Sequence, residues 1–249
     1  VAAVRLGFYC LGSVAAGMIY PPLIAWLSRG QEHATGRRQA SAPLIRFCLA
    51  WNIGLVSGLF SAGLAFGLDC RLPFVLGTVV CLVNLIAVHC TDASTAVPLA
   101  KPSAVPTPAS DRARAVLFTR ISWLSNLAGA FAMGLVLHLF SDLAVDLGIP
   151  PRNHGSMLST LRIVVVVTYL LMHRIGFWHY RFASNVAVHV VGLAGLFLLT
   201  CANTQAGLTL GLCGLGILQG FNYFSSLYYS TTGSLEQKRG LAGGIHEAT

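Results

Sequence analysis

The stretch Ile163–Met172 reads IVVVVTYLLM and contains no charged residue. A strand of a membrane β-barrel alternates apolar and polar side chains, and this run does not alternate. A long uninterrupted apolar run is instead typical of a helix that crosses a bilayer, which takes roughly 20 residues. The stretch therefore predicts a membrane-spanning helix and sets the pattern to look for elsewhere in the chain.

The composition of the whole chain favours the same class. The 249 residues are 55% hydrophobic and 10% charged, and their mean hydropathy is +0.71. A soluble domain carries about 25% charged residues, so this chain has too few to cover a surface that faces water. The cysteines form no CxxC pair, and we expect neither a disulfide framework nor a metal site. The expected fold class is all-α, a polytopic helical membrane protein.

Length and apolarity predict about seven spans, and an eighth would begin near Ile245. The basic residues test this count, because the connections between the spans are alternately rich and poor in Lys and Arg. Most of the 16 Lys and Arg lie on one set of connections, and the other set carries Arg71 and Arg152. Basic loops stay in the cytoplasm, so the bias predicts the orientation as well. The predicted spans are Leu6–Leu27, Ile45–Leu68, Leu72–His89, Val116–Phe140, Met157–Met172, Phe182–Cys201 and Leu208–Ser230.

One connection differs in kind from the others. Residues 91–114, TDASTAVPLAKPSAVPTPASDRAR, contain four prolines and predict a semi-rigid or disordered linker, which the charge rule places in the cytoplasm. It would separate the end of an N-terminal helical bundle (1–90, about three spans) from a C-terminal bundle (115–249, about four spans and the start of the next). The chain begins and ends inside apolar or glycine-rich runs, so we expect a fragment of a longer protein, truncated at both ends.

Two stretches resemble the major facilitator superfamily, whose two six-helix halves are joined by a long cytoplasmic linker. LAWNIGLVSGLFSAGLAFG (Leu49–Gly67) is similar to the family's fifth helix, whose motif is G-x-x-x-G-P-x-x-G-G. Gly54, Gly58 and Gly63 match that motif, whereas Leu59 replaces its proline and an alanine replaces one glycine.

The second stretch, YYSTTGSLEQKRGLAGGIHEAT, resembles the passage from the tenth helix through a cytoplasmic loop into the eleventh. Arg239, Gly240 and Glu247 would then belong to that loop and to the entry of the next helix. The seven spans would be helices four to ten, and the resemblance implies a secondary transporter that works by alternating access around a central site.

The three glycines of the motif have two interpretations. Small residues let helix backbones approach closely, so Gly54, Gly58 and Gly63 would form a packing seam. The resemblance implies instead a gating motif that limits leak by controlling how the two halves pack. Leu59 removes the kink-forming proline, and drug:proton antiport is therefore not specifically favoured.

Polar side chains on the predicted spans are candidates for the substrate path. Ser125, Asn126 and Gly129 share one helix face, and Gln219 and Asn222 share another. A polar stripe avoids lipid, so it faces other helices or a water-filled path, and contacts between helices are the alternative. Helices seven and ten line the central cavity in the family. The candidates for the substrate path are Asn52, Asn126, Arg162, Gln219, Asn222 and Tyr223.

Arg162 is the cation placed deepest in a predicted span. At that depth it must snorkel to the surface, pair with a carboxylate or line a cavity, and in a cavity it would bind an anionic substrate group. Asp and Glu lie near span ends or in loops, so the coupling ion, a proton or sodium, stays open.

Two alternatives to a transporter remain. His246-Glu247 is the first half of H-E-x-x-H, which would make an intramembrane metalloprotease if the missing histidine followed. A receptor or channel subunit without transport turnover is the other. We expect a transporter of a small solute and not an enzyme, without cofactor or metal and without nucleic-acid partners. It would be a monomer in the bilayer of the cell (inner) membrane, where a small-molecule substrate and a coupling ion are its partners.

Overall fold

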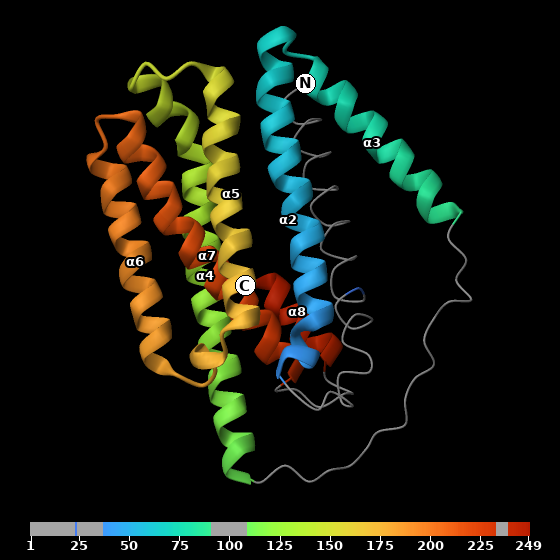
Figure 1. Cartoon of the computed structure of the whole chain (residues 1–249), viewed down its shortest axis with the longest axis vertical. Helices are drawn as coiled ribbons and strands as arrows, with labels where there is room; N and C mark the ends of the chain where they lie inside the picture. Colours follow the sequence, from blue (N-terminus) through green and yellow to red (C-terminus); the bar gives the residue numbers. More distant parts are fainter. Residues whose placement is uncertain (1–22, 24–36, 91–108, 233–238) are drawn as a thin grey trace.

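The computed structural model describes residues 23, 37–90, 109–232 and 239–249. This part of the chain contains helices and no strand, which confirms the all-α class. Figure 1 shows an elongated bundle with long helices running along its axis. The predicted span Leu6–Leu27 lies outside the described residues except for Leu23. The elements are α2 (Arg37–Leu68), α3 (Leu72–His89), α4 (Ala109–Asp146), α5 (Pro151–Arg174), the short η3 (Gly176–Trp178), α6 (Phe182–Cys201), α7 (Gln205–Thr232) and α8 (Arg239–Ala248).

Five helices of the described part, α2 to α6, are long and apolar enough to cross a membrane. Their outward side chains are largely apolar, and α3 buries no residue at all. In Figure 1, α3 leans away from the other helices. Exposed apolar surface of this extent suits lipid and not water. The five helices therefore fit an integral, multi-pass membrane protein.

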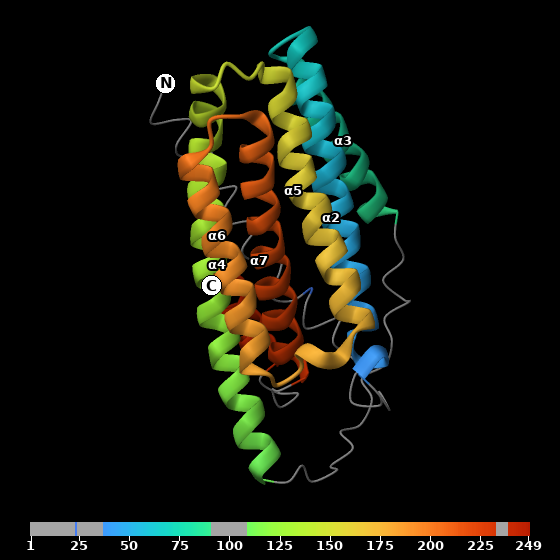
Figure 2. The ribbon, with the colours of Figure 1, turned by 60° about the vertical axis from the view of Figure 1, so that its left-hand side comes forward.

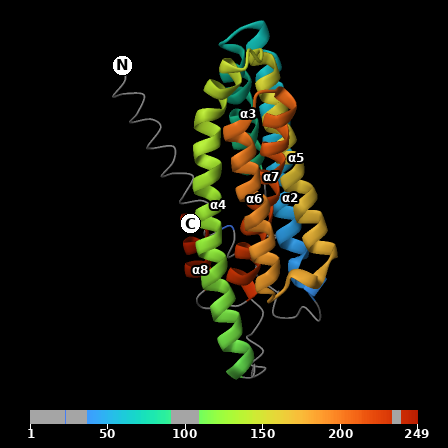
Figure 3. The ribbon, with the colours of Figure 1, turned by 90° about the vertical axis from the view of Figure 1, so that its left-hand side faces the viewer.

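Helix α7 is long enough to cross a membrane but is not one of these five. Amide, hydroxyl and glycine residues occupy much of its second half, and they lower its hydropathy. Helices α4, α5 and α6 all pack against α7, and Figures 2 and 3 show it enclosed by them. A helix surrounded by protein can carry polar side chains because other helices supply their partners.

The turns between helices alternate between the two ends of the bundle (Figure 1). Arg71 and Arg152 flank turns at one end, whereas Arg174 and Arg181 flank the turn between α5 and α6 at the other. The predicted order of spans requires that these two pairs of arginines lie at opposite ends of the bundle. Gly148, in the turn between α4 and α5, has a φ of 66°, a left-handed conformation that glycine adopts without steric cost.

The boundary of the predicted linker needs a correction. Helix α4 begins at Ala109, so the last residues of the predicted linker 91–114 are helical. Pro108, the last proline of the segment, immediately precedes the helix. Residues 109–114 contain no proline, the residue that breaks helices, so nothing in them prevents helix formation. Residues 91–108 lie outside the described part of the chain.

Helix α2, from before the linker, packs along α5, from after it (Figure 2). Near one end of this α2–α5 seam, the Ser41 hydroxyl lies 2.7 Å from Nδ1 of His173. Further along, Ser159 donates a hydrogen bond of 3.2 Å to the carbonyl of Val56. The two predicted halves of the chain thus meet through one long helix pair.

Candidate functional site

Amide side chains from α4 and α7 meet in the interior of the bundle. Asn222 is fully buried, and its Nδ2 donates a hydrogen bond of 2.7 Å to the carbonyl of Ser125. Gly129 lies beside this pair, because a Cβ added there would be 3.0 Å from Asn222 Nδ2 and 3.1 Å from Gln219 Oε1. The predicted stripes on the two helices therefore face each other, and a larger residue than glycine would displace the amides.

Helix α8, which Figure 3 shows next to α4, adds an imidazole and a carboxylate to this group. His246 is fully buried, and its Nδ1 lies 2.8 Å from the hydroxyl of Ser226 on α7. Asn126 on α4 donates from Nδ2 to the carbonyl of His246 at 3.1 Å. The hydroxyl of Tyr223 donates to Oε1 of Glu247 at 3.0 Å. Three helices are thus connected by hydrogen bonds at one level of the bundle.

The other wall of this group comes from α2 and α5. Asn52 is buried near the middle of α2, and its Nδ2 donates to the carbonyl of Cys48 at 2.9 Å. Tyr169 on α5 lies beside Asn52 and Cys48 and is within electrostatic range of Glu247. The ring centroids of Tyr169 and Tyr223 are 6.3 Å apart. The contact between these two rings joins the residues of α2 and α5 to those of α4, α7 and α8. Together they form the polar cluster, which consists of Asn52, Asn126, Tyr169, Gln219, Asn222, Tyr223, Ser226, His246 and Glu247.

Several buried atoms of the polar cluster have no hydrogen-bond partner among the described residues. Buried polar atoms in folded proteins are nearly always paired, so such a concentration indicates a place for water or a polar ligand. Nε2 of His246 is 3.6 Å from Oε1 of Glu247, too far for a hydrogen bond. The unpaired atoms are Asn52 Oδ1, Asn126 Oδ1, Gln219 Oε1, Asn222 Oδ1 and His246 Nε2.

Arg162 lies on α5 two helical turns from Tyr169, on the same side of the helix. The residue is half-buried, and its Nε is buried without a hydrogen-bond acceptor. Within the described chain, the guanidinium makes no hydrogen bond and no ion pair. The structure therefore leaves a cation next to the polar cluster without a counter-charge from the described residues.

The three motif glycines differ in their surroundings. Gly63 lies in the α2–α5 seam, where an added Cβ would be 3.1 Å from Gly155 Cα. Gly54 and Gly58 are exposed, and an added Cβ at either would meet none of the described atoms within 4 Å. Among the described residues, close helix packing thus involves Gly63 and not Gly54 or Gly58, and Gly155 on α5 is its counterpart.

The predicted residues of the last loop lie at the start of α8. Gly240 is exposed and would meet no described atom within 4 Å if it carried a Cβ, and the side chain of Arg239 lies outside the described residues. Glu247, by contrast, belongs to the polar cluster. No group of three His, Cys, Asp or Glu side chains in the described ranges is placed to hold a metal ion.

Sequence reasoning missed Tyr169 and the role of His246 as a buried hydrogen-bonding residue. Gly155, Ser159, Arg162 and Tyr169 follow one another at intervals of four, three and seven residues, which is helical spacing, but one hydroxyl at the end of such a row is a weak signal. Its neighbours in the sequence are apolar, so the spacing alone does not single out Tyr169.

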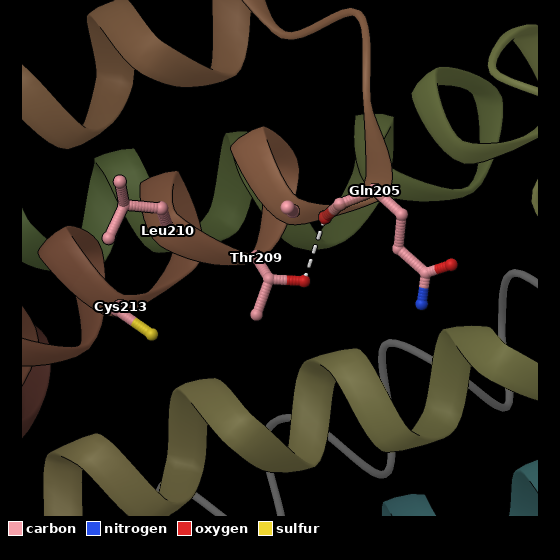
Figure 4. A pocket seen from close by; sticks show the side chains of 5 residues that line it. Gln205, Thr209, Leu210 and Cys213 are labelled. Carbon is pink, nitrogen blue, oxygen red and sulfur yellow. Dashed lines mark hydrogen bonds between the residues drawn. The ribbon is translucent and has the colours of Figure 1, made fainter.

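A hollow of about 550 Å³ lies at the other end of α7 (Figure 4). Its lining includes Gln205, Leu210 and Cys213, and Thr209 donates a hydrogen bond of 2.9 Å to the Gln205 carbonyl. Gln205 precedes Asn222 by about 25 Å along the helix axis at 1.5 Å per residue. The hollow is therefore separate from the polar cluster and carries few of its chemical groups.

Comparisons with known proteins find no family model, no curated protein and no solved structure that matches this chain.

Proposed function

We propose that the protein is a secondary transporter that moves a small polar solute across a membrane by alternating access, in the manner of the major facilitator superfamily. The observation that carries the proposal is the polar cluster. Polar side chains are costly inside a membrane protein and, where they face inward, commonly mark a solute or ion pathway. Here they converge from five helices of a bundle whose outer surface is apolar.

The position of the polar cluster supports a transport site. Asn52, Asn126 and Gln219 lie near the middle of α2, α4 and α7, and Tyr169 lies in the second half of α5, so the polar cluster lies in the middle part of the bundle and extends toward the C-terminal end of α5. A transporter that opens alternately to each side binds its solute near the bilayer midplane, between its two halves. Asn52 comes from before the predicted linker, whereas the amides of α4 and α7 come from after it.

The α2–α5 seam supports the same mechanism. It joins the two halves by side-chain hydrogen bonds at Ser41 and Ser159 and by backbone contact at Gly63. Alternating access needs two halves that meet around a central site, and the α2–α5 seam is where the predicted halves meet. Glu247 is the carboxylate within the polar cluster, and we propose it as the group through which a proton or sodium ion couples to transport.

The metalloprotease alternative gains no support from these contacts. The ring of His246 is buried and bonded to Ser226, and the carboxylate of Glu247 accepts from Tyr223. A hydrolytic site would need the carboxylate free to act on a metal-bound water.

Solute uptake into proteoliposomes tests the proposal. The purified protein is reconstituted, a proton or sodium gradient is imposed, and uptake of a panel of labelled polar solutes is measured. Asn222→Leu removes the amide but keeps the number and branching of the side-chain heavy atoms, and we expect it to lower uptake at least about tenfold, a loss of roughly 1.4 kcal/mol of transition-state stabilisation.

Asn84→Leu is the matched control, because Asn84 is exposed on α3 and the chemical change is the same. Equal uptake by the two variants would remove the polar cluster from the transport path. Saturable binding without any uptake would favour a receptor over a transporter.

A further inference from the structure

We infer that the solute is a small organic anion, and that Arg162 binds its carboxylate or phosphate oxyanion while the amides of the polar cluster bind its hydroxyl or amino groups. The inference rests on the proposed function only in calling the ligand a transported solute. The anion-binding site itself does not depend on transport.

Arg162 is eleven residues into the 24-residue helix α5, near its middle. A guanidinium at that depth in a membrane protein is costly unless water, a counter-charge or the surface receives it. Nε is buried without an acceptor, whereas the two terminal nitrogens are not among the buried unpaired atoms, and the residue as a whole is half-buried. One donor of the guanidinium is thus unused inside the bundle, and the terminal nitrogens are accessible to water or to a ligand.

The described residues supply no anion for this guanidinium. Glu247, the carboxylate of the polar cluster, accepts from Tyr223 and faces His246. Tyr169, two helical turns from Arg162, is the residue of α5 that belongs to the polar cluster. The cation therefore has no ion pair within the described chain.

Arginine presents a planar fork of donors, which matches the paired oxygens of a carboxylate or phosphate. The unpaired atoms of the polar cluster are of the opposite kind, because Asn52 Oδ1, Asn222 Oδ1 and Gln219 Oε1 all accept hydrogen bonds. A ligand that satisfies both sets carries an oxyanion at one end and hydroxyl or amino donors at the other. Hydroxy acids, amino acids and sugar phosphates have this distribution, whereas apolar cations and neutral hydrocarbons do not.

Ligand binding to the purified protein in lipid nanodiscs tests the inference. The probes are glycerate, glutamate and glycerol 3-phosphate, each at graded concentrations, with glycerol as the neutral analogue. Binding is measured as the ligand-dependent rise in unfolding temperature and by titration calorimetry. We expect saturable binding of at least one of the three anions, none of glycerol, and a loss of at least about tenfold in affinity in Arg162→Gln.

Two further variants separate binding from folding. Arg162→Lys keeps the charge but not the fork, and we expect it to retain part of the affinity. Arg120→Gln removes an exposed arginine of α4 and is expected to bind the anions as the unaltered protein does. The unfolding temperature without ligand shows whether each variant is folded.

The outcomes distinguish this inference from the proposed function. Anion binding that depends on Arg162, without uptake in proteoliposomes, would support the site and refute the transporter. Uptake of neutral solutes would support the transporter. If, in addition, no anion bound, or Arg162→Gln bound the anions as tightly as the unaltered protein does, the anion site would be overturned. Failure of all three anions to bind overturns the inference as well.

Discussion

Gly155→Ala tests how closely the two halves of the chain are packed. A Cβ at Gly155 would overlap the carbonyl oxygen of Leu59 and lie 3.1 Å from Cα and 3.3 Å from the nitrogen of Gly63. All of these are backbone atoms, so no side-chain rotation relieves the overlap and the two helices must separate. Overpacking of this kind costs up to about 3 kcal/mol, and alanine recovers about 1 kcal/mol through its helix propensity.

The expected net loss is therefore about 2 kcal/mol, which lowers the unfolding temperature by roughly 4–8 °C in a protein of this size. Intrinsic fluorescence during heating measures it, with every variant in the same lipid and at the same scan rate. Gly134→Ala on α4 is the matched control, because an added Cβ there meets no described atom within 4 Å. The close packing of α2 on α5 would be refuted if Gly155→Ala and Gly134→Ala unfolded at the same temperature.

Two further substitutions probe hydrogen bonds of α7. Tyr229→Phe removes the phenol oxygen that accepts from the backbone N–H of Tyr180 at 2.8 Å, and we expect about 1 kcal/mol of lost stability, or an unfolding temperature about 2–4 °C lower. Ser226→Ala leaves the buried Nδ1 of His246 unpaired and should cost about 1–3 kcal/mol and reduce solute uptake. Ser225→Ala is the control, because the Ser225 hydroxyl donates within its own helix, and we expect it to change uptake little. Equal losses of uptake in the two serine variants would contradict a role for the contact between Ser226 and His246.

The helices themselves follow from local sequence. Apolar runs of sufficient length predict α3, α5 and α6, because a membrane helix satisfies its own backbone and needs only an apolar surface. The alternation of Arg71 and Arg152 with the more basic turns predicts which helix ends lie together. The cytoplasmic side of those turns stays a prediction, since the orientation depends on a membrane and not on the helices.

The polar cluster was partly predictable. Asn126, Gln219 and Asn222 are polar at helical spacing, and a helix face of this kind must be directed away from lipid. Tyr169 was not found because a single hydroxyl among valines and leucines leaves the face of the helix ambiguous. Spacing gives a side chain its face, but the partner on that face is set by tertiary packing.

The α2–α5 contact shows the same limit. The sequence identifies small residues on α2, but Gly54, Gly58 and Gly63 are equivalent in the motif and only the structure distinguishes them. Gly155 follows a turn and precedes the apolar run of α5, a position where glycine has many explanations. Its role depends on a helix more than 80 residues earlier in the chain, which no local pattern predicts.

The burial of α7 has a consequence for how the protein enters the membrane. A helix with Gln219, Asn222 and several serines partitions poorly into lipid when it is alone. Helix α6 precedes it across a short turn and is tightly packed on it, with a Cβ at Gly195 placed 2.9 Å from the carbonyl of Gly211. We expect α6 and α7 to insert as a hairpin, so that the apolar helix carries the polar one across the bilayer during synthesis.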